Sequence, residues 1–103
     1  MSIYVLELCN NKYYVGQSHH VTHRIRQHLK GNGSVWTKFH KPTGRYRIIQ
    51  KGDNPYNLLY VNERTVTYHL MLRFGYDNVR GAGWTRHDLN YLPDSPQDYK
   101  VLT

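Results

Sequence analysis

The sequence predicts an α/β domain in which a small three-stranded, mainly antiparallel sheet is flanked by helices. Two runs rich in β-branched and aromatic residues, 3–8 and 13–17, are separated by an Asn-Asn turn, which is typical of a β-hairpin. Two later segments, 19–30 and 56–74, repeat apolar residues at helical spacing, and a glycine follows each. A third strand is predicted between these two helices.

The chain of 103 residues is long enough for one domain with a modest hydrophobic core. We therefore expect a single domain over residues 1–103, with its core in 2–84 and a short C-terminal extension in 85–103. The single cysteine, Cys9, cannot form a disulfide within the chain, which favours a reducing, intracellular setting. Neither a membrane span nor a secretory leader is expected, because no apolar stretch has the required length and flanks.

The first half of the chain predicts two helices after the hairpin. The first is expected over His19–Lys30, with Ser18 as its N-cap and Gly31 at its end. The second is short and is predicted over Val35–His40, with Ser34 as its cap and a Lys-Pro pair after it.

The second half predicts a strand and the longest helix. The third strand is expected over residues 45–49, between two glycine-containing turns. The long helix is predicted from residue 56 or 59 to residue 74, and Gly75 is placed to end it. A last short helix is expected over 85–91, with irregular chain from Pro93 onward.

The formal net charge of +7 and an isoelectric point near 9.7 indicate a polyanionic partner. The charge is uneven, since no carboxylate lies between Glu7 and Asp53 whereas basic and aromatic residues are frequent there. A membrane surface is not favoured, because no amphipathic segment combines a broad apolar face with this charge. We expect seven residues of this stretch to contact nucleic acid: Arg26, Lys30, Trp36, Lys38, Lys41, Arg45 and Arg47.

Glu63 lies within an apolar stripe of the predicted long helix. At 100° per residue, Leu59, Val66, Leu70 and Phe74 fall within about 60° of it. A carboxylate on such a stripe is costly unless it is paired with a cation or ligates a metal. The pattern alone leaves two hypotheses for Glu63: an ion pair with an arginine, or a metal site.

Tyr4 and Tyr14 can reach one site only under a geometric condition. A regular two-residue loop at Asn10-Asn11 would pair residues 9 and 12 and would place the two tyrosines on opposite faces of the sheet. We therefore predict a loop with an odd number of residues, or a bulge.

The seven histidines raise a second metal hypothesis. His19 and His23 lie one helical turn apart, but no cysteine or carboxylate stands at zinc-like spacing around them. A structural zinc site is therefore not favoured, and we expect these histidines to face phosphate or solvent.

The spacing of five residues resembles a known family signature. Ile3-Tyr4 is followed ten residues on by Tyr14-Val15-Gly16, and Arg24 follows after a further ten. With His28 and Glu63, this order is similar to the GIY-YIG nuclease signature, over roughly residues 2–84. One departure is that Ser2 stands where the family usually has its first glycine.

The resemblance implies a GIY-YIG-like fold and metal-dependent endonucleolytic cleavage of DNA. Glu63 would hold one Mg²⁺ or Mn²⁺, and the scarcity of carboxylates on regular elements favours one metal over two. Arg24 would contact the scissile phosphate, and either Tyr4 or Tyr14 would act on the attacking water. His28 would bind a tyrosine or the phosphate, or transfer a proton.

The same resemblance assigns supporting roles to Gly16 and Asn78, although Asn78 is equally well explained as a plain turn residue. Two rival functions stay open: a noncatalytic nucleic-acid-binding protein on the same scaffold, and a nuclease acting on RNA. With little chain beyond the module, specificity would come from its own surface, from a homodimer or from a targeting partner protein.

Overall fold

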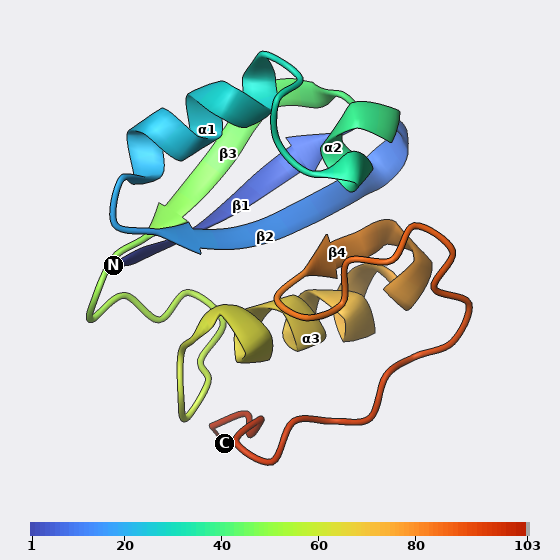
Figure 1. Cartoon of the computed structure of the whole chain (residues 1–103). Coiled ribbons are helices and arrows are strands. Elements are labelled where there is room, and N and C mark those ends of the chain that lie inside the picture. The colour runs from blue at the N-terminus through green and yellow to red at the C-terminus, as the bar shows by residue number, and fades with distance from the viewer. Residues whose placement is uncertain (103) are drawn as a thin grey trace.

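A computed structural model describes residues 1–102 as a mixed α/β fold around a four-stranded sheet of order β3-β1-β2-β4 (Figure 1). β1 (Ser2–Leu8) and β2 (Lys12–Ser18) form an antiparallel hairpin. β3 (Pro42–Ile49) pairs antiparallel with the other edge of β1, and β4 (Val79–Gly81) pairs parallel with β2. The predicted fold class is confirmed, with one strand more than expected.

The additional strand, β4, was missed because it is only three residues long and carries no periodic pattern. Its partner β2 lies more than sixty positions earlier in the chain, and a parallel pair requires a crossover connection between its strands. Such long-range pairing leaves no local signal in the sequence.

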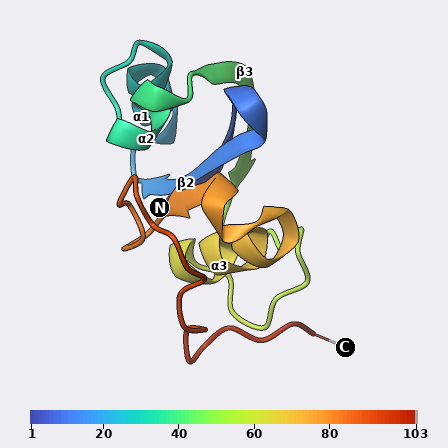
Figure 2. The ribbon, with the colours of Figure 1, turned by 90° about the vertical axis from the view of Figure 1, so that its right-hand side faces the viewer.

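Helices cover both faces of the sheet. Figures 1 and 2 show α1 (Val21–Leu29) and α2 (Val35–Phe39) on one side and α3 (Glu63–Phe74) on the other. Two short 3-10 helices, η1 (Cys9–Asn11) and η2 (Tyr76–Asn78), complete the set. None of the helices within residues 1–102 has the length and apolar character needed to cross a membrane.

Alternation along the strands gives each face its own hydrophobic core. The core on the α1 side contains Tyr4, Leu6, Leu8, Ile25 and Trp36. The core on the α3 side contains Ile3, Val5, Val15, Ile49, Leu58, Val66, Leu70, Met71 and Val79. The two cores lie on opposite sides of one hydrogen-bonded layer, so the sheet sets which side chains can meet.

The hairpin satisfies the condition for bringing both tyrosines to one face. Leu8 pairs with Lys12, which leaves a three-residue loop in which Asn10 and Asn11 adopt φ values of 64° and 58°. Asparagine tolerates this left-handed region better than most residues. Tyr4 then lies opposite Gly16, and Leu6 lies opposite Tyr14. The predicted odd-numbered loop is confirmed.

The predicted start and N-cap of the first helix are corrected. α1 begins at Val21, with His20 rather than Ser18 at the N-cap position. The Ser18 hydroxyl instead accepts a hydrogen bond from the backbone N–H of His20 at 2.9 Å, which makes a turn before the helix. Ser34 does cap α2, as predicted, by accepting from the backbone N–H of Thr37.

The predicted start of the long helix is wrong. α3 begins at Glu63, and Asn62 caps it through a reciprocal capping box with Thr65. Asn57 has a positive φ of 56°, and Leu58 forms an isolated β-bridge with Val101, so the chain before Asn62 cannot be helical. Glu63 therefore stands at the first position of the helix rather than inside it.

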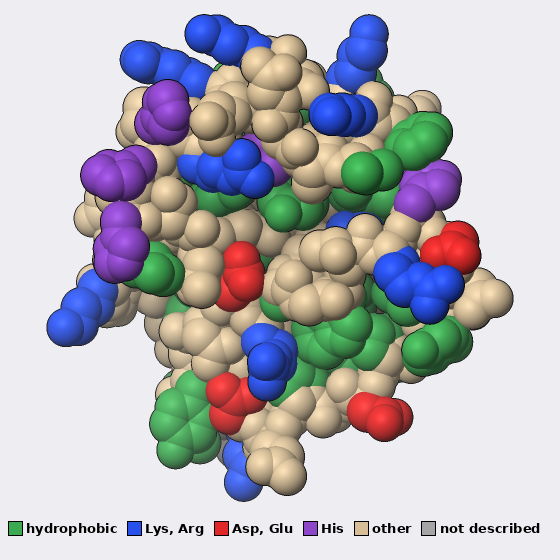
Figure 3. Space-filling view, viewed as in Figure 1, with side chains coloured by type: hydrophobic (Ala, Val, Ile, Leu, Met, Phe, Trp, Pro, Cys, Tyr) green, Lys and Arg blue, Asp and Glu red, His purple; other side chains and the backbone are tan. Residues whose placement is uncertain are grey.

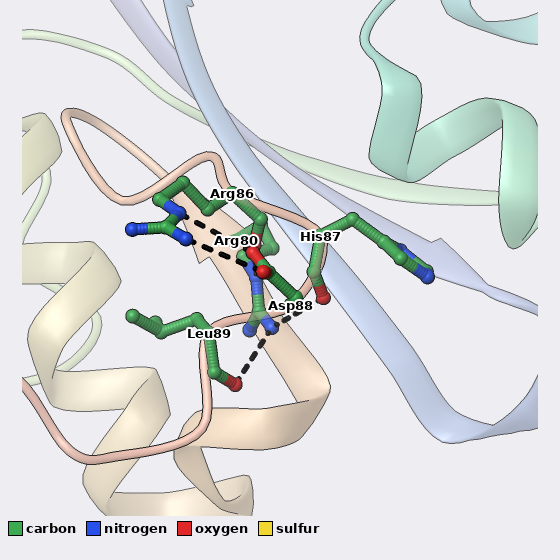
Figure 4. A network of polar contacts seen from close by, with 5 residues as sticks. All are labelled: Arg80, Arg86, His87, Asp88 and Leu89. Carbon is green, nitrogen blue, oxygen red and sulfur yellow. Dashed lines mark hydrogen bonds and ion pairs between the residues drawn. The ribbon is translucent and has the colours of Figure 1, made fainter.

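The C-terminal segment packs against the domain without the predicted helix at 85–91. Arg80 is 1% exposed, and its guanidinium donates five hydrogen bonds to backbone carbonyls, at 2.6–3.3 Å. Three of them belong to Arg86, His87 and Leu89, as Figure 4 shows in close-up. Carbonyls that point at Arg80 cannot also serve an α-helical ladder, which explains the extended course of this segment.

Candidate active site

A chain of hydrogen bonds links the sheet to α1 and α2 on the α1 side. The hydroxyl of Tyr4, in the middle of β1, lies 2.9 Å from Nε2 of His28, in the last turn of α1. Nδ1 of His28 lies 3.1 Å from the Thr37 hydroxyl, and this hydroxyl donates to the backbone carbonyl of Ser34 at 3.0 Å. Tyr4, His28 and Thr37 are all buried.

These contacts determine the protonation of His28. Because the Thr37 hydroxyl donates its proton to Ser34, it accepts the hydrogen bond from Nδ1–H of His28. Nε2 therefore carries no proton and accepts from the Tyr4 hydroxyl. Burial lowers the pKa of His28 to about 4, and the charge of Arg24 adds to this shift. His28 is neutral at physiological pH.

The two tyrosines meet this histidine from neighbouring strands. The ring centroid of Tyr14 lies 4.9 Å from that of His28 and 6.4 Å from that of Tyr4. Burial raises the pKa of Tyr4 to about 12, and burial followed by the charge of Glu63 raises the pKa of Tyr14. The positive charge of Arg24 opposes these shifts, because it lowers the pKa of both tyrosines. Tyr14 is half-buried, whereas Tyr4 is only 1% exposed.

Arg24 lies on α1 one turn before His28 and is partly exposed. Its guanidinium donates to the side-chain oxygen of Gln27 at 2.8 Å, and no carboxylate forms an ion pair with it in the described part of the chain. Its charge acts on the pKa values of Tyr4, Tyr14 and His28, so it lies close to all three. A guanidinium without an acidic partner can bind a phosphate.

Glu63 is the first residue of α3 and is half-buried. Burial raises the pKa of its carboxyl group, and a hydrogen bond from the backbone of Gln17, near the end of β2, partly offsets this rise. Its negative charge raises the pKa values of Tyr4 and Tyr14, so the carboxylate acts on the tyrosine cluster. Among residues 1–102 the one ion pair joins Arg86 to Asp88, and the ion-pair reading of Glu63 is thus not supported.

The carboxylate of Glu63 lines a hollow of about 290 Å³. The other lining residues are Gln17, Asn62, Arg64, Ala82, Gly83 and Asp98. Among residues 1–102 no group of three or more His, Cys, Asp or Glu side chains is arranged to hold a metal. Any cation at Glu63 would therefore keep most of its own water ligands.

Two glycines make room for the hydrogen-bonded chain. A Cβ on Gly16 would overlap the ring and hydroxyl of Tyr4, which explains the supporting role predicted for Gly16. A Cβ on Gly33 would overlap the imidazole of His28. Sequence reasoning missed Gly33 and also Thr37, because their partners are set by how α1 and α2 meet and not by any local pattern.

Asn78 lies away from the tyrosines. Its side chain donates to the carbonyl of Phe74 at 2.7 Å and accepts from the ammonium of Lys12 at 2.6 Å. These bonds join the end of α3 to the start of β2. None of them reaches the tyrosine cluster, so the structure supports the reading of Asn78 as a turn residue.

The predicted nucleic-acid contacts divide between the two faces. Arg26, Lys30, Lys38 and Lys41 are exposed around α1 and α2, and Figure 3 shows Lys and Arg side chains along the upper part of this face. Trp36 is 3% exposed, and its indole N–H donates to the Tyr13 carbonyl, so the expected contact of Trp36 with nucleic acid is wrong.

Arg45 and Arg47, also predicted to contact nucleic acid, lie on the other face of the sheet. Arg47 pairs with Val5 across the sheet, and paired residues share a face, so Arg47 points toward the α3 side. Arg45 lines the same groove as Val5 on that side. The tyrosines point to the opposite side.

The histidines near the start of α1 are exposed. Figure 3 shows histidine side chains at the left edge of the face, over the beginning of α1, where His19, His20 and His23 lie. His23 lies 3.4 Å from the amide nitrogen of Gln27. Their exposure agrees with the expectation that they face solvent or phosphate.

Comparison with known proteins gives one match. The model of the GIY-YIG catalytic domain matches residues 1–73, which include Tyr4, Tyr14, Arg24, His28 and Glu63. No curated protein and no solved structure shows significant similarity to the chain. Since the match covers more than half of the sequence, the chain belongs to the GIY-YIG family, whose catalytic domains are nucleases.

Proposed function

We propose that this protein is an endonuclease that hydrolyses DNA phosphodiester bonds with one divalent metal ion held by Glu63. The observation that carries the proposal is the grouping of two phenols, a neutral histidine and the Arg24 guanidinium, with the Glu63 carboxylate acting on both phenols and neither charge in an ion pair within residues 1–102. Phosphodiester hydrolysis needs groups that orient water and groups that balance charge on the phosphate.

The surroundings of Glu63 fit Mg²⁺ or Mn²⁺. The carboxylate is partly desolvated and forms no ion pair in the described chain, and its hollow includes the oxygen-bearing side chains of Gln17, Asn62 and Asp98 beside Arg64. Hard divalent cations prefer such oxygen ligands. When bound, the ion would supply positive charge to the phosphate and to the departing oxygen.

The two tyrosines have different tasks in this proposal. Tyr4 is buried, and its hydroxyl donates to His28, so it positions the neighbouring Tyr14 ring. Tyr14 is partly exposed and takes the proton of the attacking water. Its raised pKa means that the phenolate is the minor form at neutral pH, so the rate should rise by about tenfold per pH unit.

Arg24 binds the scissile phosphate in this proposal. Its guanidinium is partly exposed and has no carboxylate partner within the described residues, so it can form two parallel hydrogen bonds to phosphate oxygens. The exposed basic residues around α1 and α2 extend this positive surface along the nucleic-acid backbone.

Plasmid nicking in Mg²⁺ tests the role of Glu63. Glu63→Gln should lower the cleavage rate by at least about 100-fold, because several kcal/mol of charge stabilisation are lost. Asp94→Asn is the control, since Asp94 is exposed in the C-terminal segment and lines neither the hollow at Glu63 nor the groove around Arg47, so the rate should be unchanged. Equal nicking by the wild type and Glu63→Gln would refute the mechanism.

Two tyrosine variants test the division of tasks. Tyr14→Phe should abolish the rise of rate with pH, whereas Tyr4→Phe should lower the rate but keep that slope, because Tyr14 still titrates. Initial rates between pH 6 and 9 measure both. The reverse pattern would assign the base to Tyr4.

Parallel substrates separate the rival functions. Single-stranded and structured RNA, incubated beside the plasmid, distinguish an RNA nuclease from one acting on DNA. Binding that weakens with salt, without cleavage of any substrate, would favour a noncatalytic nucleic-acid-binding protein.

A further inference from the structure

A groove lies on the side of the sheet opposite the tyrosine cluster. It has a volume of about 370 Å³, within the range of small-molecule sites. α3 contacts β2 and β4, and the groove opens where the face of β1 and β3 extends past the last turn of this helix. Its polar lining residues include Glu7, Arg45, Arg47, Tyr56 and Arg73.

The groove carries an excess of positive charge. Arg45, Arg47 and Arg73 contribute three guanidinium groups, and Glu7 is the only carboxylate in the lining. None of these four residues takes part in an ion pair within residues 1–102. Arginines gathered without acidic partners favour an anionic ligand, and phosphate matches their planar fork.

The cations converge on one place from two elements. Arg47 comes from β3 and Arg73 from the last turn of α3. Both arginines line the groove together with Tyr56, whose pKa is raised by burial and lowered by the charges of Arg47 and Arg73. A phosphate at this point would meet two arginines and a phenol.

One side of the groove is lined by apolar and aromatic side chains. The rings of Tyr13 and Phe74 stack with centroids 4.4 Å apart and an interplanar angle of 11°, and Phe74 is 37% exposed. The Arg73 guanidinium lies 5.7 Å from the Phe74 ring centre. Val5 and Leu70 complete the apolar lining. The exposed part of Phe74 offers an apolar ring surface against which a nucleobase can pack.

We propose that this groove binds a nucleoside phosphate, with the phosphate at Arg47 and Arg73 and the base against the Tyr13–Phe74 wall. The ligand is either a free nucleotide or an unpaired nucleotide within a strand, because both present the same chemistry. The site lies across the sheet from the tyrosine cluster and does not require the protein to cleave nucleic acid.

Titration of the ¹⁵N-labelled wild-type chain with dAMP, followed by NMR, tests this. Amide shifts should centre on Glu7, Arg47 and Phe74. Inorganic phosphate and deoxyadenosine should each bind at least about 10-fold more weakly, since each lacks half of the contacts. Shifts centred on Tyr4, Tyr14 or Arg24, or equal affinity for inorganic phosphate, would overturn the proposal.

Charge-matched variants give a second measurement. Arg47→Gln/Arg73→Gln should raise the Kd for dAMP by at least about 10-fold, whereas Lys51→Gln/Lys100→Gln, with the same change of charge at exposed positions, should change it by less than about twofold. Equal weakening by both pairs would show nonspecific attraction and overturn the proposal. Circular dichroism confirms that each variant is folded.

A third titration, with a single strand of DNA, distinguishes a free nucleotide from a nucleotide within a strand. A single-stranded oligodeoxynucleotide, added to the Glu63→Gln chain, should shift the same groove amides. Saturation by dAMP alone identifies a free nucleotide, and much tighter binding of the strand identifies a second contact for nucleic acid. Because dAMP contains no phosphodiester bond, failure of the cleavage mechanism would leave this result unchanged.

Discussion

At the scale of single residues, His28 is the most constrained group of the site. Both ring nitrogens have partners, Tyr4 at 2.9 Å and Thr37 at 3.1 Å, and the side chain is fully buried. The neutral form satisfies both contacts, since one nitrogen donates and the other accepts. A proton on Nε2 would remove the acceptor of the Tyr4 hydroxyl and place a charge beside Arg24.

Acidification should therefore destabilise the protein. The pKa of His28 is about 4 in the folded chain and near 6.5 when unfolded, so the unfolded state binds the extra proton between these values. Its contribution to the free energy of unfolding is fully present above about pH 6.5 and is lost as the pH falls toward 4. Urea unfolding at pH 7 and pH 4.5 should differ by roughly 3 kcal/mol.

His28→Gln should reduce this pH dependence, whereas His19→Gln at an exposed position should keep it. A smaller slope will remain in His28→Gln, because burial also lowers the pKa values of His40 and His69. Identical slopes for the wild type and His28→Gln would contradict the assignment of a neutral His28.

The packing of Gly33 against His28 leads to a second residue-scale prediction. Gly33→Ala should lower the free energy of unfolding by about 1–3 kcal/mol, because the new methyl group would overlap the imidazole. Gly83→Ala, where a Cβ meets no atom within 4 Å, should change it by less than about 0.5 kcal/mol. Thermal or urea unfolding compares the two, and equal effects would argue against the tight contact.

At the scale of elements, the capped start of α3 fixes the position of Glu63. Asn62 accepts from the backbone N–H of Thr65, and the Thr65 hydroxyl accepts from the backbone N–H of Asn62. This capping box ends the preceding loop one residue before Glu63. The cap thus fixes the backbone position of Glu63, whose carboxylate accepts a hydrogen bond from the backbone of Gln17 in β2.

Removing this cap should affect both stability and activity. Asn62→Ala should lower the free energy of unfolding by about 0.5–2 kcal/mol and reduce cleavage, because Glu63 loses its fixed position. Asp98→Ala is the control for stability, since it removes the hydrogen bond that the Asn62 amide donates to Asp98 at 2.8 Å and leaves the capping box intact. Cleavage is not compared for this variant, because Asp98 lines the hollow at Glu63. If Asp98→Ala has the full effect, the capping box is not the cause.

At the scale of the whole molecule, the C-terminal segment belongs to the fold rather than extending from it. Trp84, Leu89 and Tyr99 pack against the core on the α3 side. Arg80 binds carbonyls on both sides of itself in the chain, and its guanidinium lies 4.3 Å from the Trp36 ring centre. One buried cation thus joins β4 to the segment after it, as Figure 4 shows, and contacts α2 through Trp36.

Arg80→Lys should consequently destabilise the entire domain. An ammonium has three donors and cannot replace five fixed hydrogen bonds, so several carbonyls would lose their partners. We expect a loss of roughly 2–4 kcal/mol in urea unfolding, against less than about 0.5 kcal/mol for Arg26→Lys at an exposed position. Retention of wild-type stability would refute the central role of Arg80.

The sequence by itself determined the elements whose signals are local. Strand alternation identified the hairpin, the Ser34 cap identified α2, and the need for an odd-numbered loop or a bulge at Asn10 follows from the two-residue period of a strand. The spacing of Tyr4, Tyr14 and Arg24 was enough to indicate the family, because residues ten apart on a hairpin and its following helix can meet without help from the rest of the chain.

Only the tertiary structure decided the contacts between distant segments. The pairing of β4 with β2, the carbonyls that surround Arg80, and the burial of Trp36 all depend on which faces pack together. The same is true of the Tyr4–His28–Thr37 chain and of the separation of Arg47 from the tyrosines. Periodicity and capping act over a few residues, whereas burial and hydrogen-bond partners are set by the whole fold, so no local pattern can specify them.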